Sequence, residues 1–147
     1  MAEGKPLLLQ CRRCCRKSDP DYKNYTQVEL GGCREIRQAD DITQAAIDSE
    51  PLILFHPVNP GYPLIDFIYQ DKEGTFHAFQ VTTSAAHSAK TNDLQAVEKR
   101  LAGRRFRLYY LVPGEKFRSF VTDPAVPETT LAIVPSAPGT PVFGRIG

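Results

Sequence analysis

The sequence lacks any long apolar segment. Its longest apolar runs, residues 52–55 and 108–112, have the length of β-strands, whereas a helix that spans a bilayer needs about 20 apolar residues. Residues 7–9 are too few for the apolar core of a secretory signal, and basic residues follow them closely. We therefore expect a soluble, intracellular protein with no membrane-embedded part.

Net charge is nearly absent as well, at +1 from 18 basic and 17 acidic side chains. A value so close to zero points to no particular class of partner. Basic residues are nevertheless grouped in two stretches, residues 5–17 and 99–107. The second stretch holds Lys99, Arg100, Arg104, Arg105 and Arg107 with no acid between them. Each stretch either contacts nucleic-acid phosphates or forms an ordinary solvated surface.

Cysteines are few, and all lie early in the chain, at Cys11, Cys14, Cys15 and Cys33. In an intracellular chain they do not predict a disulfide framework. The spacing of Cys11 and Cys14 suits two zinc ligands, but no second pair follows at a usual distance. Free or packed thiols are the alternative.

The 147 residues contain no internal repeat and fit one domain of ordinary size. We expect a basic, irregular arm over residues 1–38, an α/β core over 39–123 and a proline-rich tail over 124–147. The arm has room for one short strand at residues 25–30. In the core we expect a helix from about residue 40 to 48, strands at 52–55, 63–70 and 75–82, a helix at 91–102 and a strand at 106–112. Further short strands are expected at 117–122 and 131–134.

A hairpin at the centre of this core determines which side chains share a face. The loop Lys72-Glu73-Gly74, with glycine in the left-handed position, would pair Asp71 with Thr75. Asp66 then stands opposite Gln80, and alternation divides the hairpin into two faces. One face carries Leu64, Asp66, Ile68, Phe76, Ala78, Gln80 and Thr82, and the other carries Ile65, Phe67, Tyr69, His77, Phe79 and Val81.

Asp66, Gln80 and Thr82 form a polar cluster at the end of the hairpin away from its turn. A carboxylate among apolar neighbours is costly unless it is paired or binds a cation. The cluster therefore predicts either a cation site or a structural role, in which Asp66 pairs with an arginine or caps a loop and Gln80 donates a hydrogen bond to it.

The residues around this cluster resemble a known family. The segments PLID at residues 63–66 and FQVTTSAAH at residues 79–87 are similar to the nuclease-like domain of crinkler effectors and trypanosome retrotransposon hot-spot proteins. That domain is similar to the PD-(D/E)xK restriction-endonuclease superfamily. The resemblance covers roughly residues 39–113, and it implies a restriction-endonuclease-like core of helix, three-strand meander, helix and strand.

The resemblance also implies the roles of individual residues. Asp66 matches the metal-binding aspartate, and the implied Mg²⁺ would be held by Asp66, the Gln80 amide oxygen and the Val81 carbonyl. Gln80 stands where the superfamily usually has an acid, and Thr82 where it usually has lysine. This site therefore carries less charge of both signs than the family pattern.

Other residues must then supply the missing groups. Lys90 is the candidate for the phosphate-binding cation, and His87 could orient a water or contact phosphate. A second acid could come from the first helix or its entry, where Glu35, Asp40, Asp41 and Glu50 all qualify.

Three functions follow from this reasoning. The first is a metal-dependent nuclease that cleaves DNA, and the second is a nuclease-fold module without chemistry that binds nucleic acid or a protein. The third is an accessory domain, because crinkler and hot-spot proteins are usually longer and often carry a nucleotide-hydrolysing domain. This chain has no loop of the type G-x-x-x-x-G-K-[ST] and so no such ATPase. The family resemblance also implies a nuclear destination.

Overall fold

The structure is a computed structural model that describes residues 7–13, 26–62, 65–81, 91–112 and 129–133. The elements in chain order are β1 (Leu7–Arg13), β2 (Thr26–Leu30), β3 (Glu35–Ala39), α1 (Ile42–Asp48), β4 (Ile53–Pro57), β5 (Phe67–Gln70), β6 (Phe76–Val81), α2 (Thr91–Arg100), β7 (Phe106–Val112) and β8 (Thr129–Ile133). The predicted strand at 117–122 lies outside the described residues.

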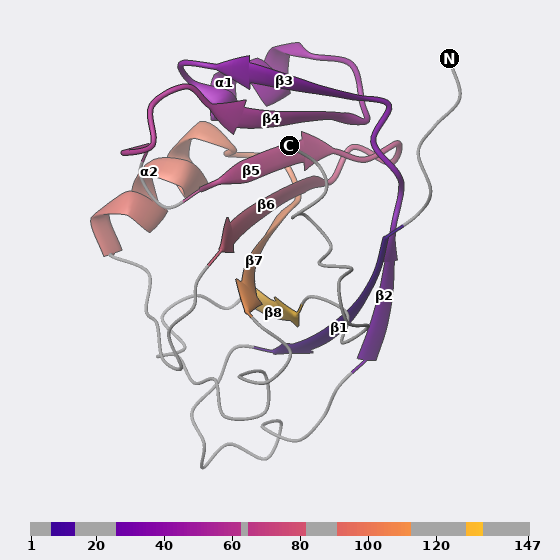
Figure 1. Cartoon of the computed structure of the whole chain (residues 1–147). Helices are drawn as coiled ribbons and strands as arrows, with labels where there is room; N and C mark the ends of the chain where they lie inside the picture. Colours follow the sequence, from indigo (N-terminus) through magenta and orange to yellow (C-terminus); the bar gives the residue numbers. More distant parts are fainter. Residues whose placement is uncertain (1–6, 14–25, 63–64, 82–90, 113–128, 134–147) are drawn as a thin grey trace.

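All described strands belong to one sheet, in the order β2-β1-β8-β7-β6-β5-β4-β3 (Figure 1). The pairs β1–β2, β1–β8, β4–β5 and β5–β6 are antiparallel, and the pairs β3–β4, β6–β7 and β7–β8 are parallel. A mixed sheet with two helices confirms the α/β class. Neither described helix has the length and apolar character needed to cross a membrane.

The centre of the chain has the expected element order of helix, three strands, helix and strand. Strands β4, β5 and β6 form an antiparallel meander. Helix α2 then carries the chain back across the sheet, so that β7 lies parallel to β6, as a crossover between parallel neighbours requires.

Helix α1 begins where an acidic side chain can satisfy its first free N–H groups. Asp41 is the N-cap, and its Oδ1 accepts a hydrogen bond from the Gln44 N–H at 3.1 Å. Its Oδ2 lies 2.6 Å from Arg100 Nη1 at the end of α2. Tyr62 from the loop after β4 donates its hydroxyl to Asp41 Oδ1 at 3.0 Å. One carboxylate thus fixes the α1 start, the α2 end and a loop.

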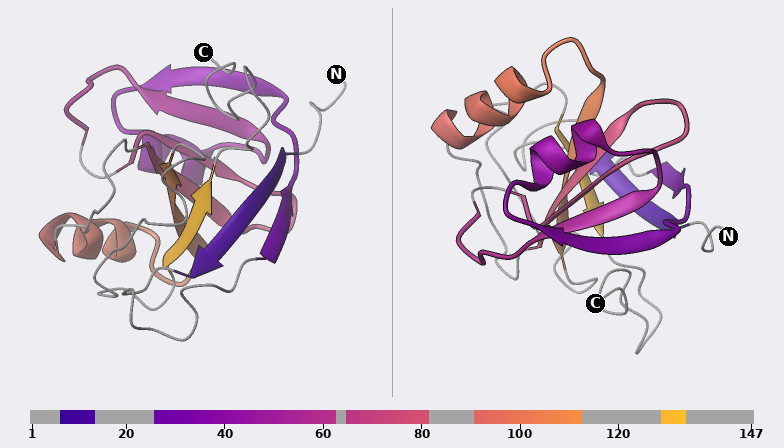
Figure 2. Two further views of the ribbon diagram at one scale, coloured as in Figure 1. Left: turned by 60° about the horizontal axis from the view of Figure 1, so that its bottom comes forward. Right: turned by 90° about the horizontal axis from the view of Figure 1, so that it is seen from above.

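The hydrophobic core lies between the helices and one face of the sheet, here called the helix side (Figure 2). Ile42 and Ala46 from α1, Val97 from α2 and Leu101 directly after α2 are buried there. The strand residues of this core are Ile53, Phe55, Ile65, Ile68, Phe76, Ala78, Leu108, Tyr110 and Val112. Because such a core needs apolar side chains at every second strand position, it fixes the register of the central strands.

The expectation of an irregular arm over residues 1–38 differs from the structure. Strands β1 and β2 and all but the last residue of β3 fall within this segment, and all three belong to the sheet. Only the strand near residues 26–30 was expected. Strand β3 was missed because its sequence, EIRQA, is mostly polar, which suits an edge strand that has no buried neighbour on one side. Strand β8, expected in the tail, lies between β1 and β7.

Candidate functional site

The β5–β6 hairpin has the predicted register along its whole paired length. Phe67 pairs with Phe79, Ile68 with Ala78, Tyr69 with His77 and Gln70 with Phe76. The Asp71 N–H donates to the Thr75 carbonyl at 2.9 Å, and Gly74 has φ of +89°, the left-handed conformation that glycine adopts without strain. The sequence of the turn therefore fixed the pairing as expected.

The strand pairing changes at Asp66. The Asp66 N–H donates to the Phe79 carbonyl at 2.7 Å, although Phe79 is already the residue opposite Phe67. Two residues facing one define a β-bulge. Consistent with it, Ile65 and Ile68 both lie in the helix-side core, although they are three positions apart.

This bulge corrects the predicted faces of the hairpin. Ile65 belongs to the helix side, not to the aromatic face, and it takes the place opposite Gln80 that the regular register assigns to Asp66. Asp66 therefore does not lie on the same face as Ile68, contrary to the prediction. An extra residue in a strand shifts every later side chain by one position.

The Asp66 carboxylate instead lies against the backbone of the neighbouring strand. Its Oδ2 accepts a hydrogen bond from the Val81 N–H at 2.8 Å. Because β5 begins only at Phe67, the carboxylate takes the place of the main-chain carbonyl that would otherwise pair with this N–H. Burial raises the pKa of the Asp66 carboxyl, and the Val81 hydrogen bond offsets part of that rise.

Gln80 provides a second oxygen with an unmet need. Its side-chain Oε1 is buried and accepts no hydrogen bond within the described residues. Leaving a buried amide oxygen without a partner costs about 1–3 kcal/mol. Asp66 and Gln80 thus both lie at the end of the hairpin where β5 begins and β6 ends, here called the rim end, although the bulge removes Asp66 from the face that Gln80 shares with Ala78.

The remaining predicted site residues fall into two groups. Thr82, His87 and Lys90 lie outside the described residues, so their placement stays a prediction. The candidate second acids are described, and three of them have other contacts. Asp41 pairs with Arg100, Glu35 with Arg37, and Glu50 with Arg34, while Asp40 is exposed. The described part of the chain contains no group of three or more His, Cys, Asp or Glu side chains that could hold a metal ion.

A hydrogen-bonded chain at the opposite end of the hairpin, here called the turn end, was not predicted. His77 Nε2 lies 2.8 Å from Asp71 Oδ2, and His77 Nδ1 lies 2.8 Å from the Tyr109 hydroxyl. His77 is 4% exposed and Tyr109 is fully buried. With a neutral imidazole, Tyr109 donates to Nδ1 and Nε2–H donates to Asp71, so both ring nitrogens are satisfied.

The electrostatics of the turn end follow from this geometry. Burial lowers the pKa of His77, and the Asp71 carboxylate only partly offsets it. Burial opposes ionisation of Asp71, but hydrogen bonds from His77 and from the N–H groups of Thr75 and Glu73 lower the pKa of its carboxyl below the usual value. The folded protein therefore holds a neutral imidazole beside an ionised carboxylate.

Aromatic rings surround the Asp71–His77–Tyr109 network on the face of the sheet that is turned away from the helices. The ring of Tyr69 stacks on His77 at 5.2 Å between centroids, and that of Phe79 stacks on Tyr109 at 4.8 Å. The Tyr69 hydroxyl is buried with no hydrogen-bond partner among the described residues, and burial raises its pKa. The sequence signal for this network was a histidine in an aromatic strand, because a buried imidazole needs a partner at each nitrogen.

The second basic stretch lies far from Asp66 and Gln80. The Arg105 carbonyl accepts from the Phe76 N–H at 2.8 Å, which places residues 104–107 at the turn end, where β6 begins. Strand β6 then extends for about 17 Å before it reaches Val81. Arg104, Arg105 and Arg107 are exposed, whereas Arg100 is paired with Asp41.

The described residues assign no functional role to the cysteines. Cys33 is half-buried and free, and burial raises the pKa of its thiol to about 11. A thiol with so high a pKa is a poor nucleophile. Cys14 and Cys15 lie outside the described residues, so the zinc alternative stays a prediction.

Comparison with family models, with curated proteins and with solved structures finds no match to this chain.

Proposed function

We propose that this protein is a Mg²⁺-dependent nuclease that hydrolyses DNA phosphodiesters at the rim end of the β5–β6 hairpin. The proposal rests on two side-chain oxygens at this end that can accept further hydrogen bonds. Among the described residues, Gln80 Oε1 is buried without a donor, and the half-buried Asp66 carboxylate receives one main-chain hydrogen bond. A divalent cation is the partner that relieves both.

The donor set suits a hard cation. Mg²⁺ prefers oxygen ligands and usually keeps several waters, so one carboxylate with neutral oxygens is an acceptable set. The Val81 carbonyl completes it, because in a strand this group faces the same side as the Val81 N–H that contacts Asp66. The raised pKa of Asp66 fits as well, since a nearby cation would favour the ionised carboxylate.

Each residue has a defined part in the chemistry. The Val81 N–H holds Asp66 Oδ2, and Asp66 and Gln80 would supply a carboxylate and a neutral amide oxygen to the cation. A Mg²⁺ ion held there would lower the pKa of an attacking water and neutralise charge on the phosphate. His87 would orient that water, and Lys90 would contact the phosphate in place of the lysine that Thr82 replaces.

The order of elements supports the proposal. Helix α1, the β4–β5–β6 meander, helix α2 and β7 follow one another as in the superfamily that residues 63–87 resemble. The same resemblance supports a nuclear site of action. The similar order of elements supports a nuclease, and substitutions at the site test the activity itself.

A second function rests on a different observation. Arg104, Arg105 and Arg107 are exposed at the turn end, about 17 Å along β6 from Val81, and the rim end offers one carboxylate. This arrangement fits a module that binds nucleic acid through the arginines without cleaving it. Such binding would weaken steeply with salt, because each neutralised phosphate releases counterions.

Cleavage of plasmid and single-stranded DNA, with and without Mg²⁺ or Mn²⁺, tests the first function. We expect Asp66→Ala to lower the cleavage rate at least about 100-fold, and Gln80→Glu to raise it, because it restores an acid to the site. Glu98→Ala, which removes an exposed acid on α2, is the matched control and should leave the rate unchanged.

Absence of metal-dependent cleavage by the wild type, or equal rates for wild type and Asp66→Ala, would overturn the nuclease proposal. If the protein then binds DNA and the double substitution Arg104→Glu with Arg105→Glu abolishes that binding, the second function stands. Salt-insensitive binding would count against it.

A further inference from the structure

Strand β3 is the outermost strand at its end of the sheet. Among the described strands it pairs only with β4, and Figure 2 shows it at the edge in both views. Its middle residues are exposed, with Ile36 at 42%. An exposed edge strand offers unpaired N–H and C=O groups to another strand, and proteins normally protect such edges with charged side chains, proline or a bulge. Residues 35–39 contain no proline, and their two charged side chains, Glu35 and Arg37, pair with each other.

The hydrogen bonds to β4 determine which groups of β3 face outward. Ala39 pairs with Pro57, and the Ala39 carbonyl accepts from the Val58 N–H at 3.1 Å. The main-chain groups of Ala39 therefore face β4. Because they alternate along a strand, those of Arg37 also face β4, and those of Ile36 and Gln38 face outward.

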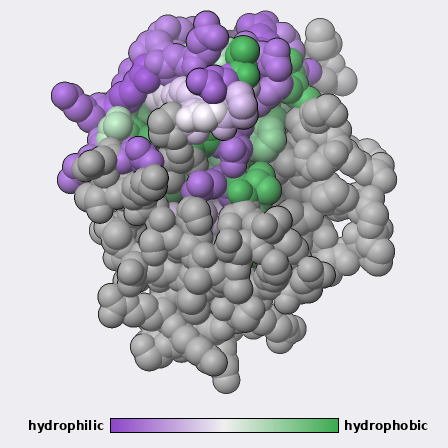
Figure 3. Space-filling model, turned by 60° about the vertical axis from the view of Figure 1, so that its left-hand side comes forward, coloured by the Kyte–Doolittle hydropathy of each residue, from purple (hydrophilic) through white to green (hydrophobic). Residues whose placement is uncertain are grey.

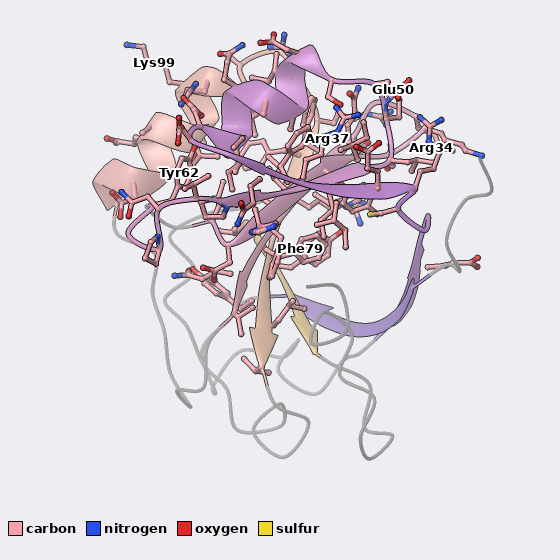
Figure 4. All side chains as sticks on the ribbon, turned by 45° about the horizontal axis from the view of Figure 1, so that its top comes forward. Arg34, Arg37, Glu50, Tyr62, Phe79 and Lys99 are labelled. Atoms are coloured by element: carbon pink, nitrogen blue, oxygen red, sulfur yellow. The ribbon has the colours of Figure 1, made fainter. Side chains whose placement is uncertain are left out.

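The charges on β3 then select one way to add a strand. Glu35 and Arg37 lie on one face and pair with each other, with Arg37 Nη2 at 3.0 Å from Glu35 Oε1. Arg37 is labelled in Figure 4, on the outermost strand. Figure 3 shows mainly hydrophilic side chains over the upper part of the molecule, where α1 and β3 lie. The edge thus has one acid and one base on either side of an exposed isoleucine.

We propose that β3 pairs antiparallel with β3 of a second copy of this chain, with Ile36 on the two-fold axis. In this register Ile36 exchanges its outward N–H and C=O with Ile36 of the second copy. Glu35 then faces Arg37 of the second copy and Arg37 faces its Glu35, so opposite charges meet on both sides of the axis. The result is one continuous sheet through both subunits.

The other symmetric registers are unfavourable. If Ile36 pairs with Gln38 of the second copy, Arg37 faces Arg37 across the axis, and like charges directly opposite each other are destabilising. If Gln38 pairs with Gln38, Arg37 faces Ala39 and the ion pairs are lost. Charge complementarity therefore favours a second copy, in the single register centred on Ile36. This inference does not depend on the proposed nuclease activity.

The contact surface is short, so we expect a weak, reversible dimer. Sedimentation velocity of the full chain, from about 5 to 500 µM, should show a monomer that converts to a dimer as concentration rises. Arg37→Glu places acid against acid at two symmetric positions, and it should raise the dimer dissociation constant at least about tenfold. Glu35→Arg should do the same.

The charge-swapped double variant, Glu35→Arg with Arg37→Glu, should restore dimerisation to within about threefold of the wild type. Lys99→Glu, which makes the same charge change at an exposed position on α2, is the matched control and should dimerise normally. Circular dichroism of each variant checks that the fold is retained.

A wild type that stays monomeric across this range would overturn the proposal. So would a dimer that tolerates Arg37→Glu, or one that the double variant does not restore. If the single variants fail to fold, Ile36→Pro decides, because it removes an outward N–H and leaves the bonds to β4 in place. A dimer that persists in that variant would contradict the β3 interface.

Discussion

The two ends of the β5–β6 hairpin hold buried polar groups in different ways. At the turn end, Asp71, His77 and Tyr109 satisfy one another through hydrogen bonds of 2.8 Å. At the rim end, within the part of the chain that the structure describes, Asp66 has one main-chain donor and Gln80 Oε1 has none. Within the described residues the Asp71–His77–Tyr109 network satisfies its own polar atoms, whereas Asp66 and Gln80 keep oxygens that can accept further hydrogen bonds.

Electrostatics separate the two ends further. Burial opposes ionisation of both aspartates, but its effect dominates only at Asp66, whose pKa is raised. At Asp71 the hydrogen bonds from His77 and from two main-chain N–H groups prevail, and the pKa is lowered. The pKa values of the two carboxyls therefore differ because Asp66 is more deeply buried and because Asp71 has more hydrogen-bond donors.

The largest effect should come from removing the imidazole at the turn end. We expect His77→Ala to lower the free energy of unfolding by about 3 kcal/mol, because it leaves a cavity and deprives Asp71 and Tyr109 of a partner. Urea denaturation measures this change. His56→Ala, at a half-buried histidine on β4, should cost clearly less. Equal losses for the two variants would show that the network contributes little.

A smaller loss should follow from removing only the tyrosine hydroxyl. Tyr109→Phe keeps the ring stacked on Phe79 but leaves His77 Nδ1 buried without a donor, at a cost of about 1–3 kcal/mol. Tyr69→Phe is a close control, because the Tyr69 hydroxyl has no hydrogen-bond partner among the described residues, and it should be neutral or stabilising. Thermal unfolding of both variants tests this expectation. A larger loss of stability in Tyr69→Phe than in Tyr109→Phe would contradict the network.

The free energy of unfolding should decrease as the pH is lowered from 7.5 to 5.5. The folded pKa of His77 lies below its usual value of 6.5, so in this range the unfolded chain binds more protons and stability rises with pH. His77→Gln should flatten the dependence, while His56→Gln should preserve it. Denaturation at several pH values tests this, and an unchanged slope in His77→Gln would place the effect elsewhere. Asp71 acts in the same direction at lower pH, because its pKa is lowered too.

The smallest effect on stability should come from the rim end. Gln80→Met replaces an unpartnered amide by an apolar group of similar size, so we expect stability within about 1 kcal/mol of the wild type and on the stabilised side. The same variant should lose metal-dependent cleavage, as expected where function keeps an unfavourable group in place. A loss of stability above about 2 kcal/mol would mean that the Gln80 amide makes favourable contacts of its own.

The structural features that the sequence predicted correctly are those that depend on residues close together in the chain. Gly74 and the turn before it fixed the hairpin register, and the first helix began close to the expected residue, with Asp41 as its N-cap. The mostly apolar segment 106–112 became β7 with the expected bounds. In each case the residues that decide the structure are neighbours in the chain.

What the sequence missed depends on distant contacts. The bulge at Asp66 is set by packing of Ile65 in the helix-side core, and alternation alone cannot reveal it. Tyr109 reaches His77 only because β7 lies beside β6. Strand β3 has a polar sequence, and its pairing with β4 makes it a strand. The prediction that Asp66 stands opposite Gln80 on one face was wrong, because the bulge brings Ile65 to that face instead.

Calorimetric titration with Mg²⁺ tests the difference between the two ends most directly. The wild type should bind the cation, Gln80→Glu should bind it at least about tenfold more tightly because it adds a carboxylate, and Asp66→Asn should not bind it. Asp71→Asn, at the turn end, should bind it as the wild type does. Equal binding by the wild type, Gln80→Glu and Asp66→Asn would contradict a cation site at the rim end.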